Sequence, residues 1–199
     1  MKQAEWKRAV RPLLPDGERW EFRGSLAYRA PTGRFLSGVL GEGSAYDRGA
    51  YVWRVSMPMF VPTDVMFLTY SQRIGGGSQR YYHQAPAEFA AAVASAIKNP
   101  PSEAEEMARI IRGAKWSPNS HLHEAAARCQ VLQGRPKDAL LTISWVAKLP
   151  PATGEWQERL HARIAELGRI IEEEGQEAAF RHVEAQVDIT AEALGPIHS

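Results

Sequence analysis

Hydrophobic and polar residues alternate along much of the first half of the chain, with a period of two residues. Such alternation is typical of a β-strand that buries one face. Five segments show this alternation or are short apolar stretches between turn residues. They are 19–30, 33–43, 50–60, 65–74 and 80–84. The first is interrupted at Gly24, and an amphipathic segment at 2–14 precedes them all. The pattern predicts one opening helix followed by four or five strands, joined by short turns into an antiparallel sheet.

The spacing of apolar residues changes in the second half to intervals of three and four, which is typical of amphipathic helices. The predicted helices cover 86–99, 102–113, 119–133, 136–149, 155–173 and 175–194. Ser102 and Glu105 are spaced as a capping box, in which each side chain bonds to a backbone N–H left free at the helix start. One apolar stripe predicts a buried seam along the helix at 155–173. Its members are Trp156, Leu160, Ile164, Leu167 and Ile171.

The two patterns meet at residues 99–101, an Asn-Pro-Pro sequence that stops a helix. We therefore predict an α+β fold in two domains. Residues 1–99 form an antiparallel sheet of four or five strands with flanking helices, and residues 100–199 form an all-helical tail of helical hairpins. Charge divides in the same way: residues 1–100 hold 13 Lys and Arg against 8 Asp and Glu, whereas residues 101–199 hold 11 against 15. This asymmetry indicates two parts with different surfaces and is too mild to indicate a nucleic-acid partner.

The composition is that of ordinary globular material, with 44% hydrophobic and 24% charged residues. Cys129 is the only cysteine, so no internal disulfide can form, and we expect a reducing, cytoplasmic location. No apolar run of about 18 residues occurs, so we expect no membrane span and no membrane partner. The first residues also lack the apolar core of a secretory signal.

Three consecutive glycines at residues 75–77 stand between two arginines. A phosphate-binding loop would need a helix N-terminus directly after the glycines, whereas the residues that follow favour a strand. We therefore interpret the glycines as a hairpin turn between two strands. The other interpretation is a nucleic-acid contact, with charge and stacking rings supplied by Arg73, Arg80, Tyr81, Tyr82 and His83. Adjacent tyrosines face opposite sides of a strand, so one surface presents only one of them, and the turn is favoured.

A group of potential metal ligands lies close together at His121, His123, Glu124 and Cys129. On one helix, His121 and His123 point about 200° apart, so they do not share a face. A zinc site would need His121 outside the helix and further ligands from elsewhere in the chain. The alternative is ordinary helix residues with a small buried cysteine, and we expect no metal and no other cofactor. No nucleophile motif appears either, so no catalytic residue is predicted.

Residues 56–64, SMPMFVPTD, place three large apolar side chains beside two prolines that would break a strand. These side chains are Met57, Met59 and Phe60. One interpretation is an edge strand that runs into a proline-bounded bend and packs on the core. The other is an exposed apolar patch that binds a partner, because methionine adapts to irregular surfaces.

Residues 120–153 resemble one tetratricopeptide-type repeat. The residues that carry the resemblance are Ala127, Gly134, Ala139, Ile143 and Pro151, and those that depart from the pattern are His123, Gln130 and Val146. The resemblance implies a helical hairpin that stacks on neighbouring helices, because one repeat cannot bury its own apolar face. Residues 51–74, YVWRVSMPMFVPTDVMFLTYSQRI, are similar to uncharacterised bacterial immunity-type proteins. This second resemblance implies a small α+β protein that binds and neutralises a toxin.

We predict from these patterns a non-catalytic protein that binds another protein, a toxin-neutralising immunity-type protein being one form of it. The predicted contacts are the apolar anchors Met57, Met59 and Phe60, together with Arg73, Arg80 and Tyr81. The alternative is an enzyme or small-ligand-binding protein with a site between the sheet and the helical tail. Its predicted ligand-binding residues are Tyr81, His83 and His121. A homodimer through the apolar stripe that begins at Trp156 is a third hypothesis.

Overall fold

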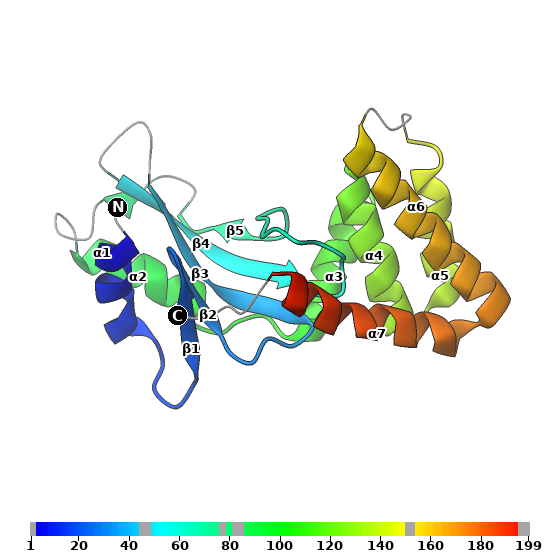
Figure 1. Ribbon diagram of the computed structural model, residues 1–199. Helices are drawn as coiled ribbons and strands as arrows, with labels where there is room; N and C mark the ends of the chain where they lie inside the picture. Colours follow the sequence, from blue (N-terminus) through cyan, green and yellow to red (C-terminus); the bar gives the residue numbers. More distant parts are fainter. Residues whose placement is uncertain (1–2, 44–48, 76–78, 81–85, 150–153, 195–199) are drawn as a thin grey trace. The chain divides into compact units, whose positions relative to one another are not determined.

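Figure 1 shows a computed structural model of the chain, which describes residues 3–43, 49–75, 79–80, 86–149 and 154–194. Contacts between residues divide the chain into two compact units. The sheet unit comprises Met1–Pro58, Asp64–Pro100 and Leu194–Ser199. The helical unit comprises Met59–Thr63 and Pro101–Ala193. The predicted α+β class, with an antiparallel sheet followed by a helical region, is confirmed.

The sheet unit is built on strands that pair in chain order. Its elements are α1 (Gln3–Val10), the 3₁₀ turn η1 (Arg11–Leu13), β1 (Trp20–Arg23), β2 (Leu26–Arg29), β3 (Phe35–Gly43), β4 (Gly49–Pro58), β5 (Gln72–Arg73), β6 (Gln79–Arg80) and α2 (Pro86–Ile97). The sheet order is β1-β2-β3-β4-β5, and β6 also pairs with β4. Every pair is antiparallel, as the sequence pattern predicts.

Two predicted strands differ from the structure. The segment 19–30, predicted as one strand with a break, is a hairpin in which β1 and β2 pair with each other. Gly24 turns this chain with a φ of 58°, a conformation that glycine adopts at little cost. The predicted strand at 65–74 reduces to the two residues of β5. Before β5, Phe67 and Tyr70 pack their rings against each other, with centroids 5.5 Å apart, outside any strand ladder.

The predicted hairpin at the glycine triplet is wrong. Arg73 pairs with Trp53, and Gln79 pairs with Ala50, so β5 and β6 run in the same direction along one edge of β4. They therefore do not pair with each other as a hairpin, and Gly76 and Gly77 themselves lie outside the described residues. Gly75, two residues after β5, has a φ of 74°, a conformation that glycine adopts at little cost.

The core of the sheet unit lies between one face of the sheet and the helices α1 and α2 (Figure 1). Trp6 of α1 is fully buried and meets Phe89 of α2 edge to face, with ring centroids 5.8 Å apart. The indole lies over Gly41 of β3, where a Cβ would collide with the ring, so this position requires glycine. Arg54 of β4 caps α2 by donating hydrogen bonds of 3.0 and 2.6 Å to two carbonyl groups near its C-terminus.

The helical unit contains hairpins of neighbouring helices. Its elements are α3 (Glu103–Ala114), α4 (Ser120–Leu132), α5 (Pro136–Val146), α6 (Glu155–Arg169), the π-helical turn η2 (Ile170–Glu174) and α7 (Gln176–Ala193). The predicted capping box opens α3. Ser102 Oγ accepts a hydrogen bond from Glu105 N–H at 3.3 Å, and Glu105 Oε2 accepts one from Ser102 N–H at 2.7 Å. Gly134, with a φ of 70°, turns the chain from α4 into α5.

The apolar seam of α6 is buried as predicted except at its first member. Leu160 and Ile164 pack with Val146 of α5, and Leu167 is also buried. Trp156 is 51% exposed, so its predicted place in the seam is wrong. The reason is its position in the first turn of α6, where its ring stacks on another ring at the surface of the unit.

Candidate interaction surfaces

An arginine lies across two aromatic rings on the sheet unit. Tyr51 and Trp53 alternate along β4 with Val52, which belongs to the core under α1 and α2, so both rings lie on the opposite face of the sheet. Arg73 of β5 is directly opposite Trp53 in the strand register. Its guanidinium lies 4.1 Å from the ring centroid of Tyr51 and 4.9 Å from that of Trp53. We call Tyr51, Trp53 and Arg73 the aromatic–arginine cluster.

One ring of the aromatic–arginine cluster is held by a hydrogen bond, whereas the guanidinium forms no ion pair with a described residue. The indole N–H of Trp53 donates a 3.0 Å hydrogen bond to Oε2 of Glu42 on β3. Arg73 is exposed, and among the described residues no carboxylate forms an ion pair with it. A guanidinium stacked on aromatic faces keeps its in-plane N–H groups for other acceptors. Arg73 can therefore donate to a carboxylate from outside the chain.

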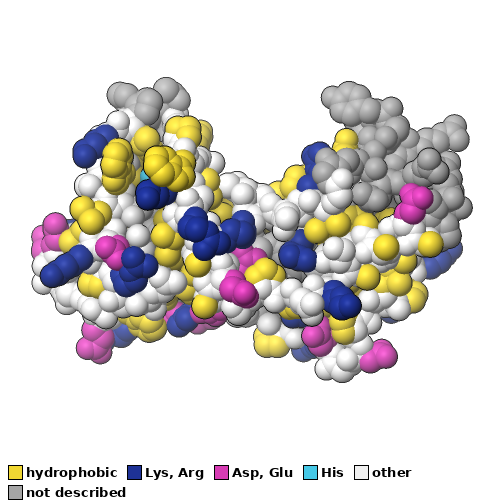
Figure 2. Space-filling view, turned by 180° about the vertical axis from the view of Figure 1, so that it is seen from behind, with side chains coloured by type: hydrophobic (Ala, Val, Ile, Leu, Met, Phe, Trp, Pro, Cys, Tyr) yellow, Lys and Arg dark blue, Asp and Glu magenta, His cyan; other side chains and the backbone are white. Residues whose placement is uncertain are grey.

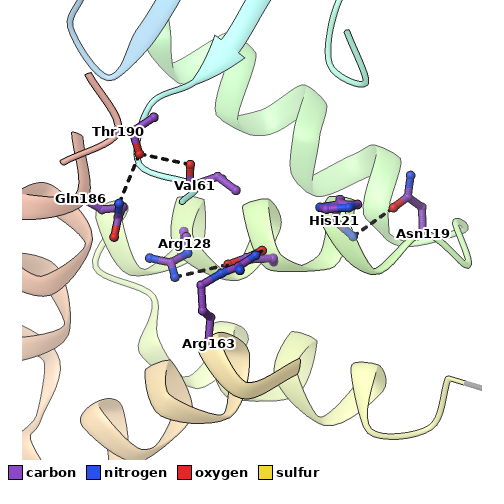
Figure 3. Close-up of polar contacts among 8 residues, drawn as sticks. Val61, Asn119, His121, Arg128, Arg163, Gln186 and Thr190 are labelled. Atoms are coloured by element: carbon purple, nitrogen blue, oxygen red, sulfur yellow. Dashed lines mark hydrogen bonds and ion pairs between the residues drawn. The ribbon is translucent and has the colours of Figure 1, made fainter. Parts of the chain in front are cut away.

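Three of the predicted partner contacts are buried. Met57, Met59 and Phe60 are each 0% exposed, so the hypothesis of an exposed apolar patch is wrong for these residues. Met59 and Phe60 lie in the short segment that belongs to the helical unit. In that segment the Val61 carbonyl accepts a 3.4 Å hydrogen bond from Thr190 Oγ1 of α7 (Figure 3). Packing on the core, the other interpretation of these residues, agrees with their burial.

The structure describes only some of the remaining residues that we predict as contacts. Tyr81 and His83 lie outside the described residues, and Arg80 is described only by its backbone in β6. The alternative ligand site of Tyr81, His83 and His121 therefore stays a prediction. His121 itself lies at the start of α4, where its ring stacks on Trp156 with centroids 5.1 Å apart and an interplanar angle of 3°. Its backbone N–H donates a 2.9 Å hydrogen bond to the capping Asn119 Oδ1 (Figure 3).

The other potential metal ligands near His121 have structural partners. His123 is buried, and its Nε2 lies 2.8 Å from the Ser117 carbonyl oxygen. Cys129 is fully buried, and this burial raises the pKa of its thiol, which keeps the sulfur protonated and unreactive. Within the described ranges, no three His, Cys, Asp or Glu side chains are grouped so that they could hold a metal ion.

A buried ion network joins α4 to α6 (Figure 3), through a link between the two helices that local sequence spacing does not reveal. Glu124 is fully buried, and its two carboxylate oxygens accept hydrogen bonds of 2.9 Å each from Nε and Nη2 of Arg163. Arg128 is 1% exposed and donates from Nη2 to Glu124 Oε1 at 3.3 Å. Its buried Nε and Nη1 have no hydrogen-bond partner in the described part of the chain. The network therefore sets two guanidinium groups against one carboxylate.

Acidification below pH 6.5 is expected to lower the free energy of unfolding. Burial lowers the pKa of His121 and of His182 below the ordinary value of 6.5. At pH values just below 6.5, these histidines bind protons in the unfolded chain more readily than in the folded chain, so protonation favours unfolding. Urea titrations at a series of pH values measure the loss. His121→Gln should reduce it, with His161→Gln as the matched control, and identical pH dependence in wild type and His121→Gln would contradict this assignment.

The chain was also compared with known proteins. No protein-family description matches it, and neither the curated proteins nor the solved structures contain a match. The resemblances to tetratricopeptide-type repeats and to immunity-type proteins therefore remain predictions.

Proposed function

We propose that the chain is a non-catalytic binding protein that recognises another protein through the aromatic–arginine cluster. The observation that carries this function is the exposed guanidinium of Arg73, stacked on two rings and without a carboxylate partner among the described residues. Tryptophan, tyrosine and arginine are the residue types most enriched among the energetic centres of protein interfaces. The cluster combines all three on neighbouring strands.

The chemistry of the cluster selects an acidic partner surface. Stacking restricts the arginine before binding, so less side-chain entropy is lost when it meets a carboxylate. The rings of Tyr51 and Trp53 supply apolar area beside the charge. A toxin with an acidic surface is the first partner class to test, because the sequence of this region resembles immunity-type proteins. A cytoplasmic location belongs to the same proposal and fits a chain whose single cysteine has no disulfide partner.

Arg73→Glu is expected to weaken partner binding by about 30-fold or more, since loss of a central interface residue costs about 2 kcal/mol or more. Tagged full-length protein is expressed in its native host, and co-purifying proteins are quantified by mass spectrometry. The matched control is Arg8→Glu, which makes the same charge change at an exposed position of α1 in the same unit.

Partners retained by wild type and by Arg8→Glu but lost by Arg73→Glu support the proposal. Arg73→Lys keeps the charge but loses the planar donor fork, so intermediate binding is expected. Thermal unfolding of the Arg73 variants checks that they fold. The same set of co-purifying proteins in wild type and Arg73→Glu would exclude the cluster as the contact.

A further inference from the structure

Three exposed tryptophans lie at one end of the helical unit. Trp116, Trp145 and Trp156 are 84%, 60% and 51% exposed. They follow α3, lie in the last turn of α5 and lie in the first turn of α6, respectively. The successive hairpins α3–α4 and α4–α5 bring the ends of α3 and α5 to the start of α4, and the stack of His121 on Trp156 brings the start of α6 there as well. We call these three residues the tryptophan end.

Lysine side chains accompany two of these rings. Lys115 Nζ lies 5.1 Å from the ring centroid of Trp116, and Lys148 Nζ lies 4.9 Å from that of Trp145. Neither ammonium group forms an ion pair with a carboxylate of the described residues. Leu141, one turn before Trp145 on the same face of α5, is 63% exposed. Figure 2 shows hydrophobic and basic side chains next to one another at this end of the helical unit, in the upper left of the view.

We propose that the tryptophan end binds the surface of an anionic lipid bilayer. Tryptophan favours the boundary between water and hydrocarbon, where its ring is buried and its N–H stays hydrated. Lysine extends an apolar stem along such a boundary and places its ammonium group at the lipid phosphates. These tryptophans flank the α3–α4 and α5–α6 connections at one end of the unit, which suits a broad surface that meets them together. No described helix is long and apolar enough to cross a bilayer, so the contact is superficial.

The accompanying basic residues distinguish a bilayer from a protein partner. Protein interfaces are enriched in tryptophan and arginine but depleted in lysine. The aromatic–arginine cluster has the composition of a protein contact, whereas the tryptophan end combines its rings with Lys115 and Lys148. Each lysine near an anionic leaflet adds attraction to its headgroups. We predict no membrane partner from the sequence because the chain shows no membrane-spanning segment. Contact with the surface of a bilayer does not require such a segment.

Full-length protein is mixed with vesicles of phosphatidylcholine alone and with vesicles of equal parts phosphatidylcholine and phosphatidylglycerol. Co-sedimentation and tryptophan emission measure binding. We expect partition into the anionic vesicles at least about 10-fold stronger than into the neutral vesicles, with a blue shift of the emission. Binding should fall at about 0.5 M salt, because salt screens the headgroup charge.

Variants at the tryptophan end identify the contact. Trp145→Ala and Lys148→Glu should each lower partition into anionic vesicles by about fivefold or more, because the first removes interfacial area and the second reverses a charge. The matched controls are Ile189→Ala, at a residue of α7 that is 56% exposed, and Lys98→Glu, at an exposed residue of the sheet unit. Both controls should bind within about twofold of wild type.

Equal losses in the variants and in their controls would overturn the proposal, as would equal binding to neutral and anionic vesicles. Absence of sedimentation with either vesicle would also overturn it and would assign the tryptophans to a protein partner or to a second copy of the chain. The contact is independent of the proposed protein-binding function. Arg73→Glu should therefore leave vesicle binding within about twofold of wild type, so the two proposals fail separately.

Discussion

Glu124→Gln is expected to lower the free energy of unfolding by about 3–5 kcal/mol, since removing one partner of a buried ion pair leaves an uncompensated buried charge. Arg128 is almost completely buried, and among the described residues Glu124 is the only carboxylate that pairs with it. Arg163 loses one of its two hydrogen bonds, because the glutamine amide keeps a single acceptor oxygen, but its side chain is 31% exposed and can be hydrated. Urea unfolding followed by circular dichroism measures the loss.

The matched control is Glu177→Gln, which removes the same charge from an exposed pair with Arg181 on α7. Its expected cost is about 1 kcal/mol or less, because exposed ion pairs contribute little. Replacing both buried residues, as in Glu124→Leu with Arg128→Met, should recover most of the stability, because it removes the buried carboxylate together with its buried partner and leaves only the hydratable Arg163. A loss for Glu124→Gln no larger than that for Glu177→Gln would show that the network does not stabilise the helical unit.

Trp6→Ala is expected to cost about 3–5 kcal/mol in the free energy of unfolding, because it removes the largest side chain of a packed core and leaves a cavity. Trp6 is 0% exposed and contacts both Phe89 and the backbone of β3 at Gly41. Thermal and urea unfolding of the full-length variant measure the loss. Trp6→Phe should cost less than Trp6→Ala, because it keeps an aromatic ring in the core and removes an indole N–H that has no hydrogen-bond partner among the described residues.

Gly41→Ala tests the same contact from the strand side. The added Cβ collides with the indole, so the single change should cost about 1–3 kcal/mol. In a Trp6→Leu background the collision is relieved, and the cost of Gly41→Ala should fall by about 0.5 kcal/mol or more, as expected for residues in contact. Costs that simply add in the double variant would contradict direct packing of the ring on the strand.

The features that could be predicted from the sequence are those determined by neighbouring residues. The capping box needs only Ser102 and Glu105, which are three residues apart, and the structure places α3 directly after Ser102. Leu160 and Ile164 are buried because their spacing puts them on one face of α6. Periodicity identifies the apolar face of an element but not what lies opposite it. Trp156 has the right spacing for the seam and is nevertheless half exposed.

The candidate sites depend on contacts between distant residues, which spacing does not show. Glu124 is chemically suited to a metal site, and its partner Arg163 lies 39 residues later in the chain. The predicted role of Arg73 in a partner contact did not include its rings, because only the register between β4 and β5 places it on Tyr51 and Trp53. The sequence pattern leaves both interpretations of Met59 and Phe60 open, exposed patch or core, since their surroundings come from another part of the chain.

The path of the chain limits how the protein can be shortened. Met59–Thr63 leaves the strands between β4 and β5 and joins the helices, and Leu194 returns to the sheet unit, where its carbonyl accepts a 2.9 Å hydrogen bond from Arg23. A fragment that ends at Pro100 would carry Met59, Phe60 and Val61 without the helices of their own unit, and a fragment that begins there would lack them. The first fragment would therefore expose an apolar segment, and the second would form an incomplete helical bundle. Experiments on this protein need the intact polypeptide.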